Sequence, residues 1–407
     1  MTPVLAPRRE LWLLLTLAGI QFTHIVDFMI MMPMGPQFTR LFGISDAQFG
    51  LLVSAYTFAA GVSGLLAAFY VDRFGRKRLL LTLYTLFAVA TLACGLAPTY
   101  GALMLARVAA GAFGGVLSAM SQTIVADVIP FERRGRAMGI IMASFSVSTV
   151  AGIPLSLFLA AHWGWHTPFF AIAGLCSLLA VFAALTLPPL TDHLLVKDRP
   201  SPLASIRQVL VDRNHQKAFA FSILLVFAGF TVIPYITIYV TTNGSMRADQ
   251  LPYIYLCGGA VTLVTSQLFG RMTDRVGKAA TFRLLALAVI LPLVATTLSA
   301  GLPVWAIVAI ATVLFTCMNG RMIPGMAIVT STANPALRGT FMTLNASIQS
   351  AAMGLAALLG GHIISRDAQG LVQNYWGNAL VGAAASLLSI WLVGRLHMHG
   401  QAAPKAG

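Results

Sequence analysis

Apolar residues run through this sequence in long stretches, and short polar segments separate one stretch from the next. A stretch of about 20 residues, folded as an α-helix, spans the roughly 30 Å hydrocarbon core of a bilayer. We place such stretches at residues 11–34, 47–70, 79–97, 100–126, 137–160, 166–188, 217–241, 250–271, 281–300, 303–330, 339–364 and 373–395. The pattern predicts an all-α membrane protein with twelve transmembrane helices.

The polar segment 189–216 divides the chain into two halves. It holds several prolines and mixed charges, and we expect a short amphipathic helix near Leu203–Val211 within it. The sequence is 58% hydrophobic and 9% charged, whereas soluble domains carry about 25% charged residues. We therefore predict two pseudo-symmetric six-helix bundles, residues 1–188 and 217–407, which a linker over 189–216 joins at the cytoplasmic surface.

The net charge of +14 reflects membrane topology. With twelve spans, 21 of the 26 Lys and Arg residues fall on the side of the membrane that holds both termini. Arg40, Arg247 and Arg366 fall on the other side, and Arg107 and Arg321 fall within spans. Cytoplasmic loops carry the excess of Lys and Arg, so both termini are expected in the cytoplasm. The positive charge therefore indicates no nucleic-acid partner.

The two halves repeat one another in sequence. Asp72-Arg73-Phe-Gly75-Arg76-Lys77-Arg78 follows the second span, and Gly270-Arg271-Met-Thr-Asp274-Arg275-Val-Gly277-Lys278 follows the eighth, with 202 residues between the two Asp positions. Arg134-Gly135 and Arg338-Gly339 match in the same way at an offset of 204. Two related six-helix units around a site at the membrane midplane are a common plan of secondary transporters.

The loop after the second span resembles the signature of the major facilitator superfamily, Gly-x-x-x-Asp-Arg/Lys-x-Gly-Arg-Arg/Lys. Ala68 stands where the family has its first glycine, and Gly270 keeps that glycine in the second copy. The resemblance covers nearly the whole chain, because the number of spans, the half-repeat and both loops agree with it. It implies a twelve-helix secondary transporter that works by alternating access.

Two further motifs carry the resemblance toward exporters. Arg107-x-x-x-Gly111 in the fourth span is similar to a motif of proton-coupled exporters. Ser148-Thr-Val-Ala-Gly152-Ile-Pro154 in the fifth resembles the antiporter motif, with Ile153 inserted between its Gly and Pro. With Gly164-Trp165 beyond it, this variant is similar to arabinose-efflux-permease-like members of the drug:proton antiporter group. The resemblance implies efflux, and it implies a bacterial source.

Asp27 is the acidic residue that we place deepest in the hydrocarbon layer. A carboxylate at the centre of a membrane helix costs roughly 2.5–3.5 kcal/mol, so it is a functional candidate by default. Asp27 and Arg107 each lie about seven residues, or roughly 10 Å, below the outer ends of their helices, so they are candidate partners at similar depth. We interpret this pair as the proton-coupling site. His24, three residues before Asp27, shares its helix face and is a candidate relay. Simple hydrogen bonding within the bundle is the alternative for both residues.

Other polar residues predict a substrate cavity and a cytoplasmic gate. The cavity candidates are polar side chains within spans of both halves, namely Tyr56, Gln122, Ser148, Tyr235, Tyr239, Gln267, Asn345 and Gln349. The gate candidates are charged residues that we place near the cytoplasmic ends of spans, namely Asp72, Arg76, Asp127, Arg134, Asp274, Arg321 and Arg338. An acid such as Asp72 that pairs with a cation in one conformation alone supplies the two-state element that alternating access requires. For Arg321, snorkelling to the interface and binding of an anionic substrate are the alternatives.

These observations predict a proton-coupled carrier in the bacterial inner (plasma) membrane that exports a drug-, sugar- or metabolite-like molecule. It is not expected to be an enzyme, because the sequence holds no phosphate-binding loop and no catalytic constellation. We expect no metal and no cofactor apart from protons as the coupling ion, and the partners expected are the substrate and the lipid bilayer, with the protein a monomer. Proton-coupled uptake, lipid or lysolipid transport, and a non-transporting receptor or scaffold remain alternatives.

Overall fold

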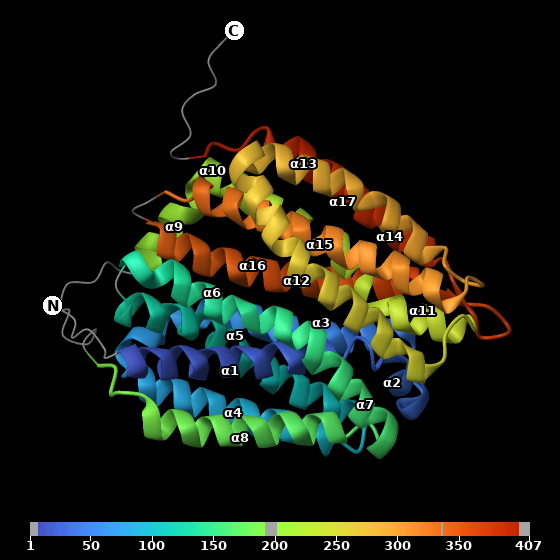
Figure 1. Ribbon diagram of the computed structural model, residues 1–407, viewed down its shortest axis with the longest axis horizontal. Helices are drawn as coiled ribbons and strands as arrows, with labels where there is room; N and C mark the ends of the chain where they lie inside the picture. The colour runs from blue at the N-terminus through green and yellow to red at the C-terminus, as the bar shows by residue number, and fades with distance from the viewer. Residues whose placement is uncertain (1–6, 130, 192–201, 335–336, 399–407) are drawn as a thin grey trace, which may run out of the picture.

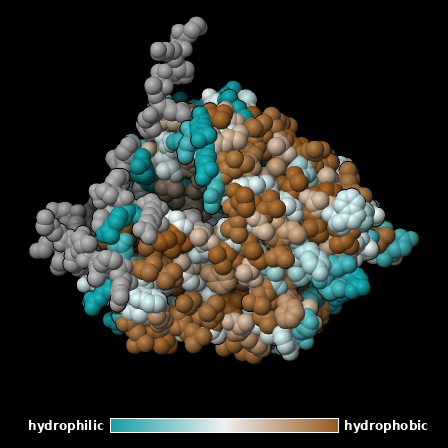
Figure 2. Space-filling view, viewed as in Figure 1, coloured by the Kyte–Doolittle hydropathy of each residue, from teal (hydrophilic) through white to brown (hydrophobic). Residues whose placement is uncertain are grey.

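The computed structural model describes residues 7–129, 131–191, 202–334 and 337–398. Among the described residues, twelve helical stretches are long and apolar enough to cross a membrane. The predicted number of spans and the all-α class are thereby confirmed. The helices run roughly parallel to the longest axis of the molecule, and hydrophilic residues gather toward the two ends of the face shown while hydrophobic ones cover its middle (Figures 1 and 2).

The N-terminal half forms one bundle, drawn blue to green in Figure 1. Its helices are α1 (Pro7–Ile30), α2 (Gly35–Phe42), α3 (Asp46–Tyr70), η1 (Val71–Arg73), α4 (Arg76–Gly95), α5 (Tyr100–Val128), α6 (Phe131–Val147), η2 (Ser148–Gly152), α7 (Ile153–Trp163) and α8 (Thr167–Thr186). Local signals set several ends. The side chain of Ser45 accepts a hydrogen bond from the Gln48 N–H and that of Gln48 accepts one from the Ser45 N–H, a capping box that starts α3.

The C-terminal half forms the second bundle, drawn yellow-green to red. Its elements are α9 (Pro202–Val211), α10 (Arg213–Phe230), η4 (Ile233–Tyr235), α11 (Ile236–Thr242), η5 (Ala248–Gln250), α12 (Leu251–Val276), α13 (Lys278–Ala288), α14 (Ile290–Thr297), α15 (Val304–Thr332), α16 (Arg338–Ile363), β1 (Ser365–Arg366), β2 (Val372–Gln373) and α17 (Tyr375–Val393). Helix α9 lies where the sequence predicts a short amphipathic helix. Helix α10 begins within the predicted linker, because Asp212 caps it by accepting hydrogen bonds from the N–H groups of Asn214 and His215.

Four of the predicted spans are not continuous helices. The first ends at Ile30 and a turn leads into α2, and the fifth contains the π-helical turn η2. The seventh breaks between α10 and α11, and the ninth is interrupted at Val289, between α13 and α14. Proline accounts for part of this, since Pro234 lies in the break of the seventh span and Pro154 follows η2. Apolar sequence continues across each break, so the hydropathy pattern does not reveal it.

The two bundles close on each other at the end of the molecule away from the chain termini. Between α3 and α16, which lie side by side, Ser54 Oγ donates to the Gly354 carbonyl oxygen over 2.7 Å. Nearer that end, Thr237 Oγ1 in α11 donates to the Met32 carbonyl oxygen over 2.9 Å. Two polar contacts between the halves, together with their shared buried apolar cluster, close this end of the interface.

Candidate functional site

A buried ion pair occupies the core of the N-terminal bundle. Arg107 Nη1 on α5 lies 3.0 Å from Asp27 Oδ2 on α1, and both side chains are at most 1% exposed. The same Nη1 donates to the backbone carbonyl oxygen of Asp27 over 3.1 Å, and Thr91 Oγ1 on α4 donates to Asp27 Oδ1 over 3.3 Å. Both carboxylate oxygens thus accept hydrogen bonds, as an ionised carboxylate does. The residues matched by depth in the sequence do contact each other.

Small residues on α5 bring Arg107 to this position. Arg107, Gly111 and Gly115 are spaced by four residues and so share one face of the helix. A Cβ added at Gly115 would lie 2.6 Å from the carbonyl oxygen and 2.7 Å from the Cα of Ala60 on α3, and Gly111 meets the backbone of Tyr56 even more closely. Only glycine allows the two backbones to approach this closely, as at helix interfaces in membranes.

Tyr56 lies between the ion pair and the space around the molecule's midplane. Its ring centroid is 4.2 Å from the guanidinium carbon of Arg107, a cation–π contact, and the ring of Phe28 is stacked on it at 5.3 Å. Tyr56 and His24 line the larger cavity described below, whereas Asp27 lines neither cavity. Within the described part of the chain, the ring nitrogens of His24 have no hydrogen-bond partner. His24 is therefore available to contact water or a ligand in the cavity.

The larger cavity lies between the halves and has a volume of about 590 Å³. It extends toward the end that carries the chain termini, since Thr123 near the end of α5 and Gly339 at the start of α16 line it. Its lining includes four of the polar residues proposed from the sequence, namely Tyr56, Gln122, Asn345 and Gln349. These four come from both halves, as a shared site at the midplane requires.

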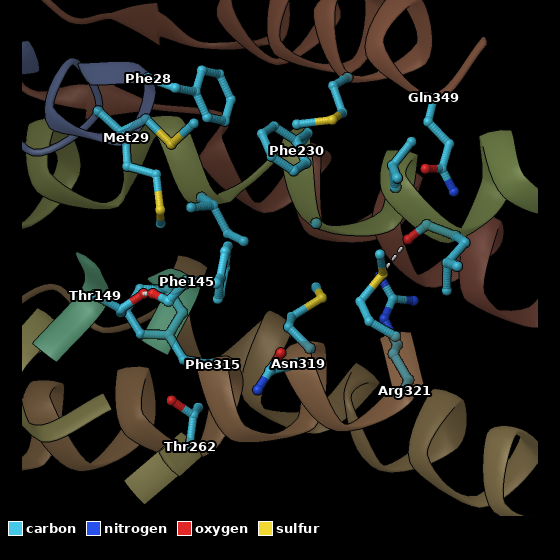
Figure 3. A pocket seen from close by; sticks show the side chains of 18 of the residues that line it. Phe28, Met29, Phe145, Thr149, Phe230, Thr262, Phe315, Asn319, Arg321 and Gln349 are labelled. Atoms are coloured by element: carbon cyan, nitrogen blue, oxygen red, sulfur yellow. Dashed lines mark hydrogen bonds between the residues drawn. The ribbon is translucent and has the colours of Figure 1, made fainter. Parts of the chain in front are cut away.

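A smaller cavity of about 280 Å³ is mainly apolar. Figure 3 shows Phe28, Phe230 and Phe315 at one end of it, with Arg321 and Gln349 at the other. Phe28, Gln349 and Met353 line both cavities, so the two are neighbours. Apolar walls with a few convergent polar groups are typical of small-molecule sites. The apolar lining is missed by a search for embedded polar residues, although Phe28 and Met29 stand directly after Asp27 in the sequence.

Four predicted cavity residues lie elsewhere. Tyr235 is buried where the halves meet, with its hydroxyl donating to the Ala357 carbonyl oxygen, and Tyr239 packs on the ring of Tyr375. Ser148 Oγ is buried and donates to the Phe22 carbonyl oxygen over 3.3 Å, and Gln267 is exposed on α12. None of these four residues lines either of the two cavities, and the hydroxyl groups of Tyr235 and Ser148 are satisfied by neighbouring backbone, as polar groups in membrane spans often are.

Four predicted gate residues have described side chains, and these four form no ion pair with one another. Arg321 was expected at the cytoplasmic end of its span, and that expectation is wrong, because it is buried in the middle of α15 and lines the smaller cavity. Arg76 is buried and Nη1 donates to the Val71 carbonyl oxygen over 3.1 Å. Asp274 and Arg338 are exposed, and neither forms an ion pair with another described residue. The side chains of the remaining candidates lie outside the described residues, namely those of Asp72, Asp127 and Arg134.

The sequence reasoning missed an ion pair that joins the halves at their closed end. Arg366, in the β1–β2 hairpin, donates from Nε and Nη2 to the two carboxylate oxygens of Asp46, each over 2.8 Å. Asp46, the first residue of α3, is 5% exposed. Its hydrogen bonds raise the pKa of Arg366 above the ordinary value, so the guanidinium remains charged. Nothing in the sequence pairs these residues, which are 320 positions apart.

Comparison with known proteins gives a consistent result. Residues 17–357 match the family model of the Major Facilitator Superfamily. The uncharacterized MFS-type transporter YtbD of Bacillus subtilis is 24% identical over 346 residues, which cover 84% of this chain and 85% of that protein. A probable sugar efflux transporter of Mannheimia succiniciproducens is 24% identical over 223 residues, 55% of each chain.

Solved structures share the fold. The D-xylose–proton symporter superimposes with a TM-score of 0.78 at 16% identity and covers 96% of this chain and 98% of its own. A bacterial homologue of the human lysosomal transporter Spinster, in an inward-facing and occupied conformation, gives 0.76 at 16% identity with the same coverage of both chains. At this level of identity the likeness extends to the twelve-helix architecture alone.

Proposed function

The chain belongs to the major facilitator superfamily of membrane transporters, and from this premise we propose that it is a proton-coupled carrier that exports a small organic molecule by alternating access. The observation that carries the proposal is the buried pair of Asp27 and Arg107. An ionisable pair held inside a membrane bundle is costly and typical of proton relays. No enzymatic step is involved, since the family transports its substrates unchanged.

In the proposed cycle, a proton from the outer face binds a carboxylate oxygen of Asp27 and removes its charge. The attraction between Asp27 Oδ2 and Arg107 Nη1 then falls, while the hydrogen bond from Nη1 to the Asp27 carbonyl oxygen holds the arginine beside residue 27. Tyr56 separates the pair from the cavity, so we assign it the role of a wall and His24 the role of a relay one turn away. Loss of the proton toward the inside restores the ion pair and is coupled to loading of substrate.

Alternating access is supported by the asymmetry of the interface. Contacts between the halves close the end away from the termini, and the larger cavity extends toward the termini. With both termini in the cytoplasm of a bacterium, as the distribution of Lys and Arg favours, this is the inward-facing state of a monomeric inner-membrane carrier. Two kinds of relative support different directions, since some relatives in sequence are probable sugar efflux transporters and one structural neighbour is a symporter. Export is favoured because the efflux relatives are the more similar in sequence.

Lipid or lysolipid transport is a second candidate, which the apolar lining of the smaller cavity favours.

The direction of transport is tested in cells, because overproduction of an exporter protects them against a toxic substrate and lowers its accumulation. Enhanced accumulation of the compound would contradict export and support uptake.

Proton coupling is tested in liposomes. Compounds that raise the melting temperature of the purified protein are identified first, and proton movement that depends on such a compound is then followed with a pH-sensitive dye. The variant Asp27→Asn is expected to abolish this movement, because an amide cannot take up the proton. Asp249→Asn, which neutralises an exposed acid paired with Arg247 at the molecular surface, is the matched control and keeps it. Undiminished coupling in Asp27→Asn would refute the assignment.

A further inference from the structure

Arg321 is a second guanidinium buried inside the molecule, in the C-terminal bundle. Its Nη2 donates to the Leu225 carbonyl oxygen on α10 over 2.8 Å, and Nη1 donates to Ser386 Oγ on α17 over 3.2 Å. The residue is 1% exposed. Its Nε has no hydrogen-bond partner in the described part of the chain. A buried donor without a partner is rare and calls for an explanation.

No acidic residue in the described part of the chain balances the charge of Arg321. Arg107 has Asp27 as its counter-ion, but among the described residues no acidic side chain forms an ion pair with Arg321. Its two partners are a carbonyl and a hydroxyl oxygen, which are dipoles without net charge. A buried charge that is not paired is strongly unfavourable, and such residues in membrane spans mark substrate or ion pathways. An anion bound beside Arg321 would supply the missing counter-charge.

The lining of the smaller cavity, which includes Arg321, also supports the binding of an anion there. Of all residues that line the two cavities, Arg321 is the one with a permanent charge. Figure 3 shows it on the same helix, α15, as Asn319 and on the same side of the pocket as Gln349. The Gln349 amide donates to the Met326 sulfur at 3.6 Å, and a thioether is a weak acceptor, so the amide is free to turn to a better one. The opposite end of the pocket is aromatic.

We propose that this pocket binds an amphipathic organic acid, with its carboxylate at Arg321 and its apolar body among Phe28, Phe230 and Phe315. The inference rests on the proposed transport function and specifies its substrate as a small lipophilic carboxylate. The Nε–H and Nη groups of arginine match the two oxygens of a carboxylate. Gln349 and Asn319 add amide donors at the same end of the pocket. Met318 and Met322, which line the pocket near Arg321, are flexible side chains that adapt to the bound ligand.

The test compares carboxylic acids with their own amides, which have nearly the same shape without the charge. The probes are phenylacetate, 1-naphthylacetate, octanoate and dodecanoate, each with its primary amide, and binding to the purified full-length protein is measured by thermal shift and by calorimetry. Hydrogen bonds to a charged group contribute about 1.5–3 kcal/mol, so at least one acid is expected to bind about 10- to 100-fold more tightly than its amide. If no acid in the panel binds more tightly than its amide, the proposal is overturned.

Variants assign the preference to Arg321. Arg321→Gln is expected to abolish the difference between acid and amide, and Arg321→Lys to retain part of it. Arg283→Gln removes an exposed guanidinium of α13 outside both cavities, and this matched control retains the full difference. A purely structural role for Arg321 would lower the melting temperature of Arg321→Gln and leave the preference intact, which contradicts the proposal. The comparison of each acid with its amide needs no variant, so it holds even where Arg321→Gln does not fold.

The failure of this inference is distinguishable from that of the proposed function. Asp27→Asn is expected to lose proton coupling and to keep its preference for the acid, because Asp27 lines neither cavity. A protein that prefers acids but moves no protons would refute proton coupling alone. A protein that couples a neutral compound to protons and shows no preference for acids would refute the carboxylate site alone.

Discussion

The energetics of the Asp27–Arg107 pair can be predicted from its surroundings. Replacing either residue by leucine removes one charge and leaves the other buried. Breaking a buried pair in this way costs about 3–5 kcal/mol, whereas replacing both partners by apolar residues is often neutral or stabilising. We therefore expect the double variant, Asp27→Leu with Arg107→Leu, to be more stable than either single variant, so that the coupling free energy exceeds the cost of one single substitution, about 3–5 kcal/mol.

The two single variants are expected to differ in their dependence on pH. In Arg107→Leu the buried carboxyl group of Asp27 has lost its counter-ion, so it takes up a proton as the pH falls. At the same pH the carboxyl group is still ionised in the unfolded chain. The folded variant then binds more protons than the unfolded one, so its stability rises as the pH is lowered. In Asp27→Leu the guanidinium stays charged at every accessible pH. It keeps the carbonyl oxygen of residue 27 and the ring of Tyr56 as partners, and no such rise is expected.

These stabilities are measured by unfolding titrations in mixed detergent micelles. The reaction of the buried thiol of Cys176 on α8 with a fluorescent reagent reports unfolding. The reasoning is refuted if the costs of the two single substitutions simply add in the double variant. It is also refuted if the destabilisation in Arg107→Leu is independent of pH between about pH 5 and pH 8, the range in which folded proteins are commonly most stable.

Two further predictions concern contacts that shape the bundle. Breaking the Asp46–Arg366 pair with Asp46→Asn is expected to open the end away from the termini. A cysteine placed at Thr237, which is buried at that closed end, should then react faster with an impermeant thiol reagent added outside. The exchanged pair, Asp46→Arg with Arg366→Asp, should slow the reaction again, and equal rates with the native, broken and exchanged pairs would contradict a closing role. Gly115→Ala is expected to destabilise the protein by about 1–3 kcal/mol because the new Cβ meets backbone of α3. Gly101→Ala, with no atom within 4 Å of the added carbon, is the control in the same unfolding titration, and an equal loss in both would argue against close α3–α5 contact.

Depth along a helix was the property that sequence predicted best. Asp27 and Arg107 were matched by counting residues from the outer ends of their spans, and the two side chains do meet, although α1 ends at Ile30, three residues after Asp27. Which helices are adjacent is decided by packing between distant parts of the chain. The contact of α5 with α3 through Gly111 and Gly115, and the donor Thr91 on α4, therefore became visible only in the structure.

Counting residues from the helix end did not give the depth of Arg321 in the membrane, because its helix is longer than the membrane core. Helix α15 has 29 residues, so at 1.5 Å per residue it is roughly 43 Å long, compared with a core of roughly 30 Å. Arg321 stands eleven residues before its end at Thr332, which is about 16 Å and close to the middle of the core. The same limit applies to Asp46 and Arg366, since hydropathy places each in an outer loop or helix end and does not show which loops meet.

The two arginines determine the charge that the proposed cycle moves. Arg107 is neutralised by Asp27 until a proton arrives, whereas Arg321 has no acidic partner among the described residues and is neutralised by the substrate. Export of a monoanion against one entering proton moves two elementary charges in the same electrical sense. A potential of 100 mV, negative inside, then contributes roughly 4.6 kcal/mol per cycle, twice the roughly 2.3 kcal/mol available for a neutral substrate. An acidic partner for Arg321 would take the place of the substrate anion and remove this gain, which is a physical reason for a cation without a counter-ion in the C-terminal half.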